Sequence, residues 1–217
     1  MRGSELLEWL STLPAGERDR ALEEHLGIAE PAPDATPPGP DLIGYHASGV
    51  AAIVRALATV PVQREDVFVD LGAGLGKVVL AAHLLTGATA RGVELQPALA
   101  ERAQAAARRL GAAVELSAGD AQNADLASGT VFYLYAPFTG AVLSKVLARL
   151  LCVASEHAIV VCALGVDLDR AAPWLVPRPG DSFWLTIYDS AVRGVPARRT
   201  AQCALPRRFT DIVASEA

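Results

Sequence analysis

Residues 67–80 read VFVDLGAGLGKVVL, and this stretch decides the fold. An apolar run leads into three glycines at alternate positions, Gly72, Gly74 and Gly76, and then into an apolar segment that suits a helix. Glycine permits a tight turn and lets the backbone approach a ligand with no Cβ in the way. The stretch therefore predicts a strand, a ligand-binding loop and a helix, in that order.

Two familiar phosphate-binding loops do not fit this spacing. A P-loop requires GxxxxGK followed by Ser or Thr, but the chain has no glycine at position 71 and carries Val78 where the hydroxyl belongs. A dinucleotide-binding loop follows GxGxxG, whose third glycine would fall on Lys77. The observed spacing is GxGxG, with Asp70 two residues upstream of its first glycine.

From Asp41 onward, short β-rich runs alternate with longer alanine-rich runs, which is the pattern of βαβ units around a parallel sheet. Strands are expected at residues 67–71, 90–94, 113–117, 131–135, 158–164, 183–188 and 200–205. Helices are expected at residues 47–58, 77–86, 97–110 and 139–151. The segment between the last two strands has Gly194, Pro196 and no apolar periodicity, so these two strands are predicted to form an antiparallel pair at one edge.

Two shorter parts precede this body. Residues 1–30 predict a helical N-terminal extension of two short helices, the first capped by Ser4. Residues 31–40 hold five prolines and form a Pro-rich linker. Residues 41–217 form the ligand-binding domain, and the extension is too small for a core of its own, so it is expected to dock there as a lid or a dimer contact.

Composition excludes several classes of protein. The chain has 217 residues, 52% of them hydrophobic, and 19 Lys and Arg against 24 Asp and Glu. The net charge of -5 supplies no general attraction for a nucleic-acid backbone, so no nucleic-acid partner is expected. Apolar runs are too short to span a bilayer, and Glu5 and Glu8 stand where a secretory signal would be basic. These features predict a cytoplasmic protein with no membrane partner.

The three cysteines, Cys152, Cys162 and Cys203, are isolated in apolar surroundings, with no CxxC pair and no His at a metal-ligand spacing. They are predicted to be small reduced core residues, and no metal site is expected.

The pattern Asp70-x-Gly72-x-Gly74-x-Gly76 after an apolar strand resembles the first signature of the class I S-adenosylmethionine-dependent methyltransferases. Gly92-Val-Glu94, closing the next strand, resembles the second. The resemblance covers about residues 42–205 and implies a Rossmann-like α/β fold, with a seven-stranded, mostly parallel sheet and a terminal antiparallel pair. It implies S-adenosylmethionine as cofactor, held by Asp70, Gly72, Ala73, Gly74, Gly76, Glu94, Leu95, Asp120 and Ala121.

The chemistry of this cofactor suits the acids at these positions. Glu94 at a strand end can accept two hydrogen bonds from a ribose. S-adenosylmethionine carries a sulfonium and an ammonium but no phosphate, so Asp70 is a suitable partner for its amino-acid end, directly or through water. Asp120 either accepts from the adenine amino group or caps the next turn.

The segment expected to face the methyl group is residues 132–140, FYLYAPFTG. It is similar in part to the (Asn/Asp/Ser)-Pro-Pro-aromatic loop of amino-methylating enzymes, but Ala136 replaces the first proline and Tyr135 the polar acceptor, which disfavours a nucleobase as substrate. Tyr135 and Phe138 are predicted to wall a channel for an amine, and Tyr45 to reach over the cofactor; simple core packing is the alternative. His46 is a candidate base or a packed or surface residue.

The glycine motif, the upstream tyrosine and the Gly-Val-Glu-Leu sequence are similar to those of non-SET protein-lysine methyltransferases. They imply in-line methyl transfer to a protein lysine side chain or a small molecule, in which orientation alone is worth ~7 to 11 kcal/mol. One alternative is a non-catalytic, S-adenosylmethionine-binding regulatory subunit, since no clear catalytic base is present. An NAD-dependent oxidoreductase is the other, resting on the glycine loop alone. The oligomeric state is not predicted.

Overall fold

The computed structural model describes residues 1–29, 41–42, 44–136, 138–179, 184–198 and 212, and all structural statements below concern these residues. A seven-stranded sheet forms the middle layer, in the order β3-β2-β1-β4-β5-β7-β6. Its strands are β1 (Val67–Leu71), β2 (Thr89–Glu94), β3 (Val114–Ala118), β4 (Val131–Tyr135), β5 (Val160–Leu164), β6 (Leu175–Pro177) and β7 (Leu185–Ser190).

The first five strands are parallel, whereas β7 runs antiparallel to β5 and to β6. The chain begins the sheet at β1, builds outward to β3, and returns to β4 on the other side of β1. In an open α/β sheet such a reversal leaves a crevice at the carboxyl ends of the two central strands. The predicted fold class is confirmed, and the position of the crevice follows from it.

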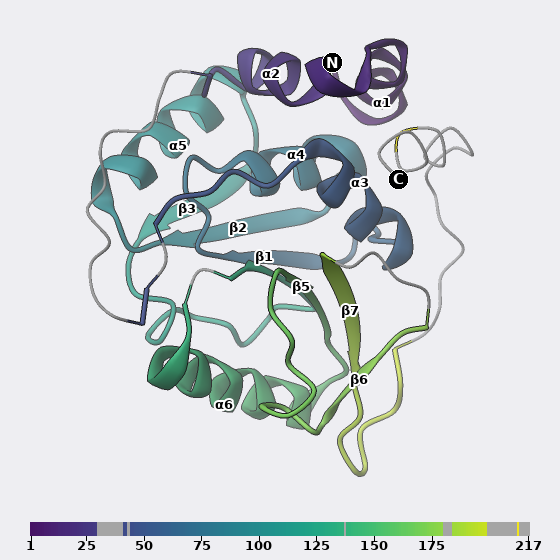
Figure 1. The fold of residues 1–217 in the computed structure, drawn as a ribbon, viewed down its shortest axis with the longest axis vertical. Helices are drawn as coiled ribbons and strands as arrows, with labels where there is room; N and C mark the ends of the chain where they lie inside the picture. Colours follow the sequence, from purple (N-terminus) through teal and green to yellow (C-terminus); the bar gives the residue numbers. More distant parts are fainter. Residues whose placement is uncertain (30–40, 43, 137, 180–183, 199–211, 213–217) are drawn as a thin grey trace.

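Helices cover both faces of the sheet (Figure 1). One face carries α3 (Val50–Thr59), α4 (Lys77–Thr86) and α5 (Pro97–Leu110), and α6 (Gly140–Glu156) packs on the other. Every residue of β5 is buried, as expected for a parallel strand covered on both faces. Apolar side chains on each side of the sheet form separate clusters, so the sheet divides the core in two.

The N-terminal extension lies outside the first helix layer, where Figure 1 shows α1 (Gly3–Thr12) and α2 (Ala15–Leu26) above α4. Its apolar residues, among them Leu6, Leu10 and Leu22, are buried in the same cluster as α3 and α4. The expectation that the extension docks on the main body therefore agrees with the structure. The predicted cap is wrong, since α1 begins at Gly3 and Ser4 lies inside it. The N-cap residue is Arg2, whose guanidinium donates to the carbonyl of Gly111 at 3.0 Å and holds the start of α1 against the main body.

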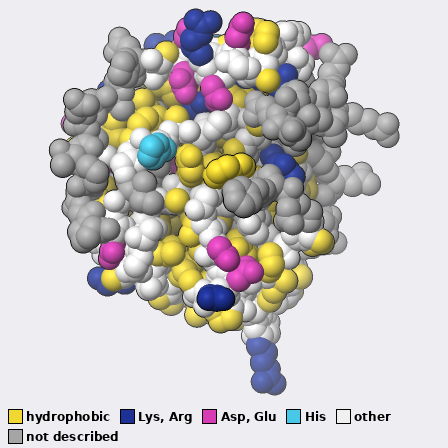
Figure 2. All heavy atoms as spheres, in the orientation of Figure 1, with side chains coloured by type: hydrophobic (Ala, Val, Ile, Leu, Met, Phe, Trp, Pro, Cys, Tyr) yellow, Lys and Arg dark blue, Asp and Glu magenta, His cyan; other side chains and the backbone are white. Residues whose placement is uncertain are grey.

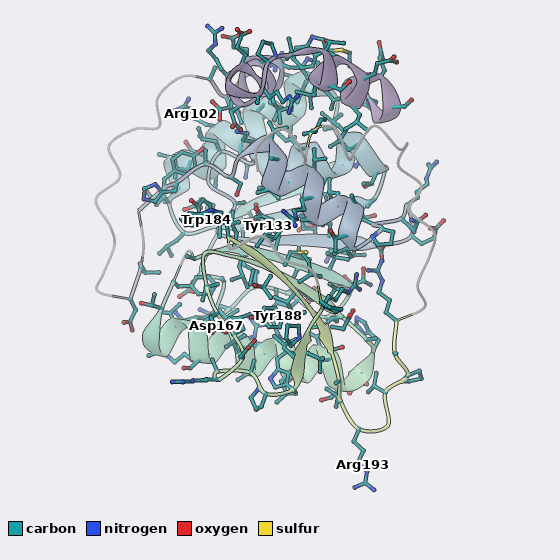
Figure 3. The ribbon with its side chains drawn as sticks, turned by 45° about the vertical axis from the view of Figure 1, so that its right-hand side comes forward. Arg102, Tyr133, Asp167, Trp184, Tyr188 and Arg193 are labelled. Atoms are coloured by element: carbon teal, nitrogen blue, oxygen red, sulfur yellow. The ribbon has the colours of Figure 1, made fainter. Side chains whose placement is uncertain are left out.

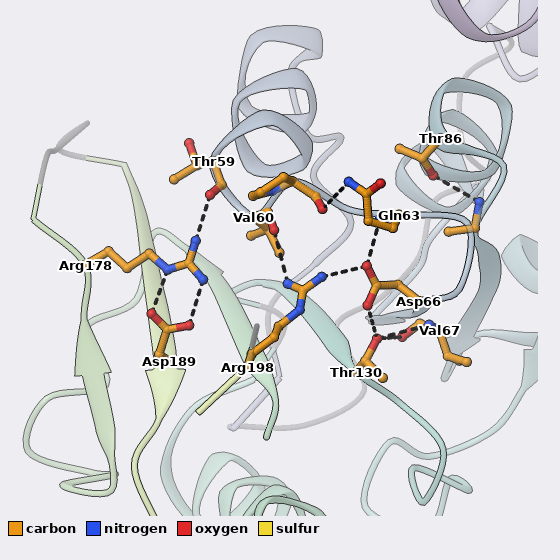
Figure 4. Close-up of polar contacts among 12 residues, drawn as sticks. Thr59, Val60, Gln63, Asp66, Val67, Thr86, Thr130, Arg178, Asp189 and Arg198 are labelled. Carbon is orange, nitrogen blue, oxygen red and sulfur yellow. Dashed lines mark hydrogen bonds and ion pairs between the residues drawn. The ribbon is translucent and has the colours of Figure 1, made fainter. Parts of the chain in front are cut away.

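Two arginines attach the C-terminal part of the described chain to α3 (Figure 4). Arg178 binds both carboxylate oxygens of Asp189 at 2.7 Å and donates to the carbonyl of Thr59 at 2.7 Å. Arg198 donates to the carbonyl of Val60 at 3.1 Å and pairs with Asp66 at 2.6 Å. Cations are favourable at a helix C-terminus, where carbonyls lack intrahelical partners.

At the antiparallel edge of the sheet, the strand that pairs with β7 is not the predicted one. The strand next to β7 is β6, which precedes it in the chain and ends in Pro177, and three residues are too few for a strand signal. The strand expected at residues 200–205 lies outside the described residues. Among the strands that correspond, β1 and β4 match the predicted bounds, and the others begin or end within two residues of them.

One cysteine also departs from prediction. Cys162 in β5 is buried, but Cys152 is exposed, because the apolar stripe of α6 that faces the sheet consists of Val146, Leu150, Val153 and their neighbours. Cys203 lies outside the described residues. Within the described part of the chain, no helix has the length and apolar character needed to cross a bilayer.

Candidate active site

A pocket opens at the carboxyl ends of β1, β2 and β4, at the crevice left by the reversal of strand order. It is lined by the glycine loop, the ends of β2 and β4, the turn after β3, and the segment before α3. Of the residues predicted for the site, Gly74 and Gly76 do not line the pocket. The others do: Asp70, Gly72, Ala73, Glu94, Leu95, Asp120, Ala121, Tyr45, Tyr135 and Phe138. His46 lines it as well and is exposed.

Gly74 and Gly76 shape the loop rather than the pocket wall. Both have positive φ, 53° and 77°, in the left-handed region that strains other residues. A Cβ on Gly74 would clash with the ring of Tyr45, so glycine here is what lets that ring lie against the loop. A Cβ on Gly76 would stand 3.1 Å from Ala103, where α4 begins against α5. The two glycines therefore set the positions of Tyr45 and α4.

Glu94 connects the glycine loop to the end of β2. One carboxylate oxygen accepts the Gly74 N–H at 2.8 Å and the other accepts the Gln96 N–H at 2.9 Å. The side chain is buried at 8% exposure and lines the pocket. A carboxylate has about four lone-pair sites, so two amides fix its orientation and leave acceptor capacity for a ligand.

Asp70 is a buried acid whose carboxyl has no hydrogen bond from any described residue. It lies at the end of β1 and lines the pocket. Burial raises the pKa of Asp70 to about 8, and the negative charge of Glu94 acts in the same direction. The carboxyl is therefore neutral at pH 7 in the empty pocket, and a cation bound beside it would favour its ionised form.

Three tyrosines line the pocket. Tyr133 and Tyr135 lie two residues apart on β4 and hence on the same face of the sheet. Tyr133, labelled in Figure 3, is buried, and its hydroxyl donates to Ser48 at 3.1 Å. Tyr135 is 37% exposed. Burial, followed by the charge of Glu23, raises the pKa of Tyr45 to about 12, so its hydroxyl stays protonated at neutral pH.

Aromatic residues also shape the mouth of the pocket. The backbone of Phe138 pairs with that of Leu42, and the Phe138 side chain is buried at 4% exposure. Beyond Tyr135, Ala136 has a positive φ of 34°, a strained conformation of the kind that persists at functional sites. Next to Tyr135, the Gly165 N–H donates to the carbonyl of Trp184 at 2.7 Å, and Trp184 is 66% exposed where β7 begins.

Both readings of Asp120 are consistent with its geometry. It lines the pocket, and one of its oxygens also accepts the Gln122 N–H at 2.8 Å, capping its own turn.

Sequence reasoning missed Tyr133, Ser48 and Lys77 as pocket residues. Period-two alternation from Tyr135 was an available signal for Tyr133. The hydrogen bond to Ser48 joins residues 85 apart and left no local pattern.

Comparison with known proteins agrees with this geometry. A family model described as Histone methylation protein DOT1 matches residues 47–132, which run from the segment before α3 into β4. An RNA methyltransferase from Salinibacter ruber, solved with S-adenosyl-L-homocysteine, is 29% identical over 70% of this chain and 97% of its own, with a TM-score of 0.56. A SAM-dependent methyltransferase from Aquifex aeolicus is 13% identical over 64% of this chain and 89% of its own, with a TM-score of 0.50, and shares the fold.

A search of the curated proteins finds no match. The match to the family model, the similarity to the Salinibacter ruber enzyme and the strand order of the sheet together identify the fold. The chain has the class I S-adenosylmethionine-dependent methyltransferase fold. Its enzyme class is S-adenosylmethionine-dependent methyl transfer, and S-adenosylmethionine is the cofactor.

The pocket of this methyltransferase suits its cofactor chemically. No cation among the described residues contacts the buried carboxyl of Asp70, and the cofactor brings two cationic groups. The one buried lysine on the described pocket wall, Lys77, points its ammonium at Asp19 and Glu23 of α2. A nicotinamide dinucleotide would bring a pyrophosphate to the glycine loop beside the buried Asp70, and the ionised form of this carboxyl would repel it. The loop also carries Lys77 where a dinucleotide-binding loop has its third glycine, and both features argue against the oxidoreductase alternative.

Proposed function

We propose that this methyltransferase transfers the methyl group of S-adenosylmethionine to the amino group of a protein lysine side chain, with a small amine as the alternative acceptor. The observation that carries the proposal is the partly exposed ring of Tyr135, which lines a pocket whose wall also holds three acids, Asp70, Glu94 and Asp120. An aromatic face attracts an alkylammonium group by about 0.5 to 2 kcal/mol.

In this proposal the predicted residues divide between the two substrates. Glu94 accepts from the ribose hydroxyls, Asp70 faces the cationic amino-acid end, and Asp120 lies by the adenine. Gly72, Ala73, Leu95 and Ala121 supply backbone and apolar contact, and Gly74 and Gly76 hold the loop in shape. Tyr45, Tyr135 and Phe138 enclose the methyl group and the entering amine.

The surface around the opening supports a cationic acceptor. Figure 2 shows hydrophobic side chains gathered near the centre of this face, with acidic side chains above and below them. Asp167 and Asp169 follow β5 and are exposed, and Figure 3 shows Asp167 and Trp184 on the same side of the molecule. On the opposite side of the opening, Glu23 of α2 is close enough to Tyr45 to raise its pKa. Such charges raise the local concentration of a basic segment.

The reaction requires orientation and the loss of one proton. The neutral amine nitrogen attacks the methyl carbon, the carbon–sulfur bond breaks with its electron pair going to sulfur, and the methylated nitrogen is left positively charged. The lysine ammonium loses this proton before attack to give the neutral amine, and His46 on the pocket wall is a candidate to relay the proton to solvent. The walls formed by Tyr135 and Phe138 align nitrogen, carbon and sulfur.

The test is incubation of the chain with methyl-labelled S-adenosylmethionine and a cell extract, followed by separate protease and ribonuclease digestion. We expect protease-sensitive label that acid hydrolysis recovers as methyl-lysine. Tyr135→Ala should lower kcat/KM for the acceptor while leaving cofactor affinity unchanged, and Val176→Ala, at an exposed apolar position on β6, is the matched control. Absence of any label transfer would favour a non-catalytic binding subunit.

RNA is the second candidate acceptor, favoured by the relative whose printed description is RNA methyltransferase. The net charge of -5 and the acids near the opening oppose a phosphate backbone. Ribonuclease-sensitive label would decide for RNA against this proposal. The cytoplasmic location and the division at residues 30 and 40 stay predictions from the sequence.

A further inference from the structure

The second N-terminal helix reaches the glycine loop through one buried lysine. Lys77 is the first residue of α4 and is 3% exposed. Its ammonium donates to Asp19 at 2.6 Å and to Glu23 at 2.7 Å, both on α2. A cation at the N-terminus of a helix opposes the helix dipole, and its burial adds a desolvation penalty. The two carboxylates of α2 offset both effects at the residue that follows the glycine loop.

Asp19 also holds the opposite wall of the pocket. The carboxylate oxygen that binds Lys77 accepts the N–H of Val50, the first residue of α3, at 2.8 Å. The N-cap of α3 is Gly49, which has no side chain to cap the helix, and the neighbouring Ser48 hydroxyl accepts from Tyr133. Asp19 therefore caps α3 from a different helix. One oxygen atom joins the starts of α3 and α4.

These two helix starts adjoin the two sides of the cofactor pocket. The loop that ends at Gly76 leads into α4, and the segment that ends at Gly49 carries Tyr45. The Tyr45 ring lies against Gly74, so the spacing between the walls is set where these segments meet. We infer that α2 is an integral part of the cofactor site and that Asp19 is a positioning residue for it, acting through Lys77 and Val50.

The inference rests on the proposed function in one respect, that the ligand is S-adenosylmethionine or its demethylated product. The test uses calorimetric titration of the full chain with S-adenosylhomocysteine, at a temperature where circular dichroism shows each variant folded. Asp19→Ala removes both contacts and should weaken binding by about fivefold or more. Asp19→Asn keeps an oxygen that can accept from the Val50 N–H, so its affinity should lie between those of the unaltered chain and Asp19→Ala. Glu17→Gln makes the same charge change at an exposed position of α2 and should bind with unaltered affinity.

If Asp19 only anchors α2 and does not position the cofactor site, the titration gives a different result. If both Asp19 variants melt at lower temperature but bind S-adenosylhomocysteine with unaltered affinity, the inference is wrong. Failure of the unaltered chain to bind either ligand instead overturns the proposed cofactor site, and the inference with it.

Reciprocity provides a second readout that needs no variant. If docked α2 favours cofactor binding, the bound ligand must stabilise docked α2 to the same extent. Hydrogen exchange of amides in residues 15–26 should therefore slow on saturation with S-adenosylhomocysteine, whereas exchange in residues 150–156, at the far end of α6, should not change. Unchanged exchange across α2 in the saturated protein would contradict the coupling.

Discussion

Cofactor binding is expected to release a proton from Asp70. Its side chain is 3% exposed, and burial together with the charge of Glu94 raises the pKa of its carboxyl to about 8. At neutral pH the ligand-free pocket therefore holds a neutral carboxyl. A cationic ligand favours the carboxylate, so the proton must leave as the cofactor enters.

The magnitude follows from this pKa. If only the carboxylate form binds, apparent affinity follows the deprotonated fraction of the free protein, which falls tenfold per pH unit well below the pKa. With a pKa of about 8, lowering the pH from about 7.5 to about 6 weakens binding about 20-fold, or about 2 kcal/mol. The range ends at about 7.5 because the ligand's own α-amino group loses its proton near pH 7.7 to 8.0.

Calorimetry in two buffers of different ionisation enthalpy measures both the affinity and the protons released. S-adenosylmethionine and S-adenosylhomocysteine share the ammonium, but only the first has the sulfonium, so equal pH dependence for both assigns Asp70 to the ammonium. Asp70→Asn should remove the dependence, and Glu101→Gln, at an exposed position of α5, should retain it. A pH-independent affinity in the unaltered chain, or a slope that survives Asp70→Asn, would refute the reasoning.

The same residue predicts the pH dependence of stability, with the opposite sign from a salt-bridged acid. Its pKa rises from an ordinary 3.8 to about 8 on folding, so the folded state holds more protons than the unfolded state between these values. The free energy of unfolding should therefore decrease as the pH rises through this window. In urea denaturation, Asp70→Asn should be more stable than the unaltered chain at pH 8, although it binds the cofactor less tightly.

Three further predictions concern the loop and the mouth. Glu94→Ala should weaken cofactor binding by roughly 1.5 to 3 kcal/mol, the scale of a hydrogen bond to a charged group, and unchanged affinity by calorimetry would remove Glu94 from the site. Gly74→Ala should lower both the melting temperature and the cofactor affinity through its clash with Tyr45, and a second change, Tyr45→Ala, should recover part of the affinity loss if that clash is the cause. Ala136→Gly should raise the free energy of unfolding by about 1 kcal/mol by relieving the positive φ, whereas no gain in urea denaturation would mean that the strain is absent.

The local sequence was sufficient to predict the central sheet and the cofactor loop. The elements β1, α4 and α5 have the predicted bounds because each is punctuated by residues with strong local preferences: Gly72 to Gly76 between β1 and α4, Gly87 after α4, and Pro97 and Gly111 at the ends of α5. Glu94 could be singled out because it ends a strand that pairs directly with β1. Parallel strands end at one edge of the sheet, so sequence order alone brings these acids and glycines together.

Long-range contacts account for most of what the sequence did not predict. The strand β6 is three residues long and is recognised only by its pairing with β7. Lys77 reads as an ordinary helix residue until α2, more than fifty residues upstream, supplies its partners. The sequence contains even less information about the methyl acceptor. The leaving group is neutral, so the reaction needs no dedicated nucleophile on the protein, and the residues near the pocket opening act by their positions. For this reason Tyr135 was found through a partial motif, and Trp184 was not found.

The pairing of Lys77 bears on the status of the N-terminal extension. The match to the family model begins at residue 47, so α1 and α2 lie outside the matched residues. Lys77 lies inside it, and a buried ammonium at the start of a helix is costly unless carboxylates meet it. Removing the partners of a buried charge typically costs about 3 to 5 kcal/mol, a large share of the stability of a single domain. Substituting Lys77 with Met, which keeps the apolar stem and removes the charge, should therefore make Asp19→Ala less destabilising than it is in the unaltered chain. Additive losses in urea denaturation of the single and double variants would mean that the extension is held by its leucines alone.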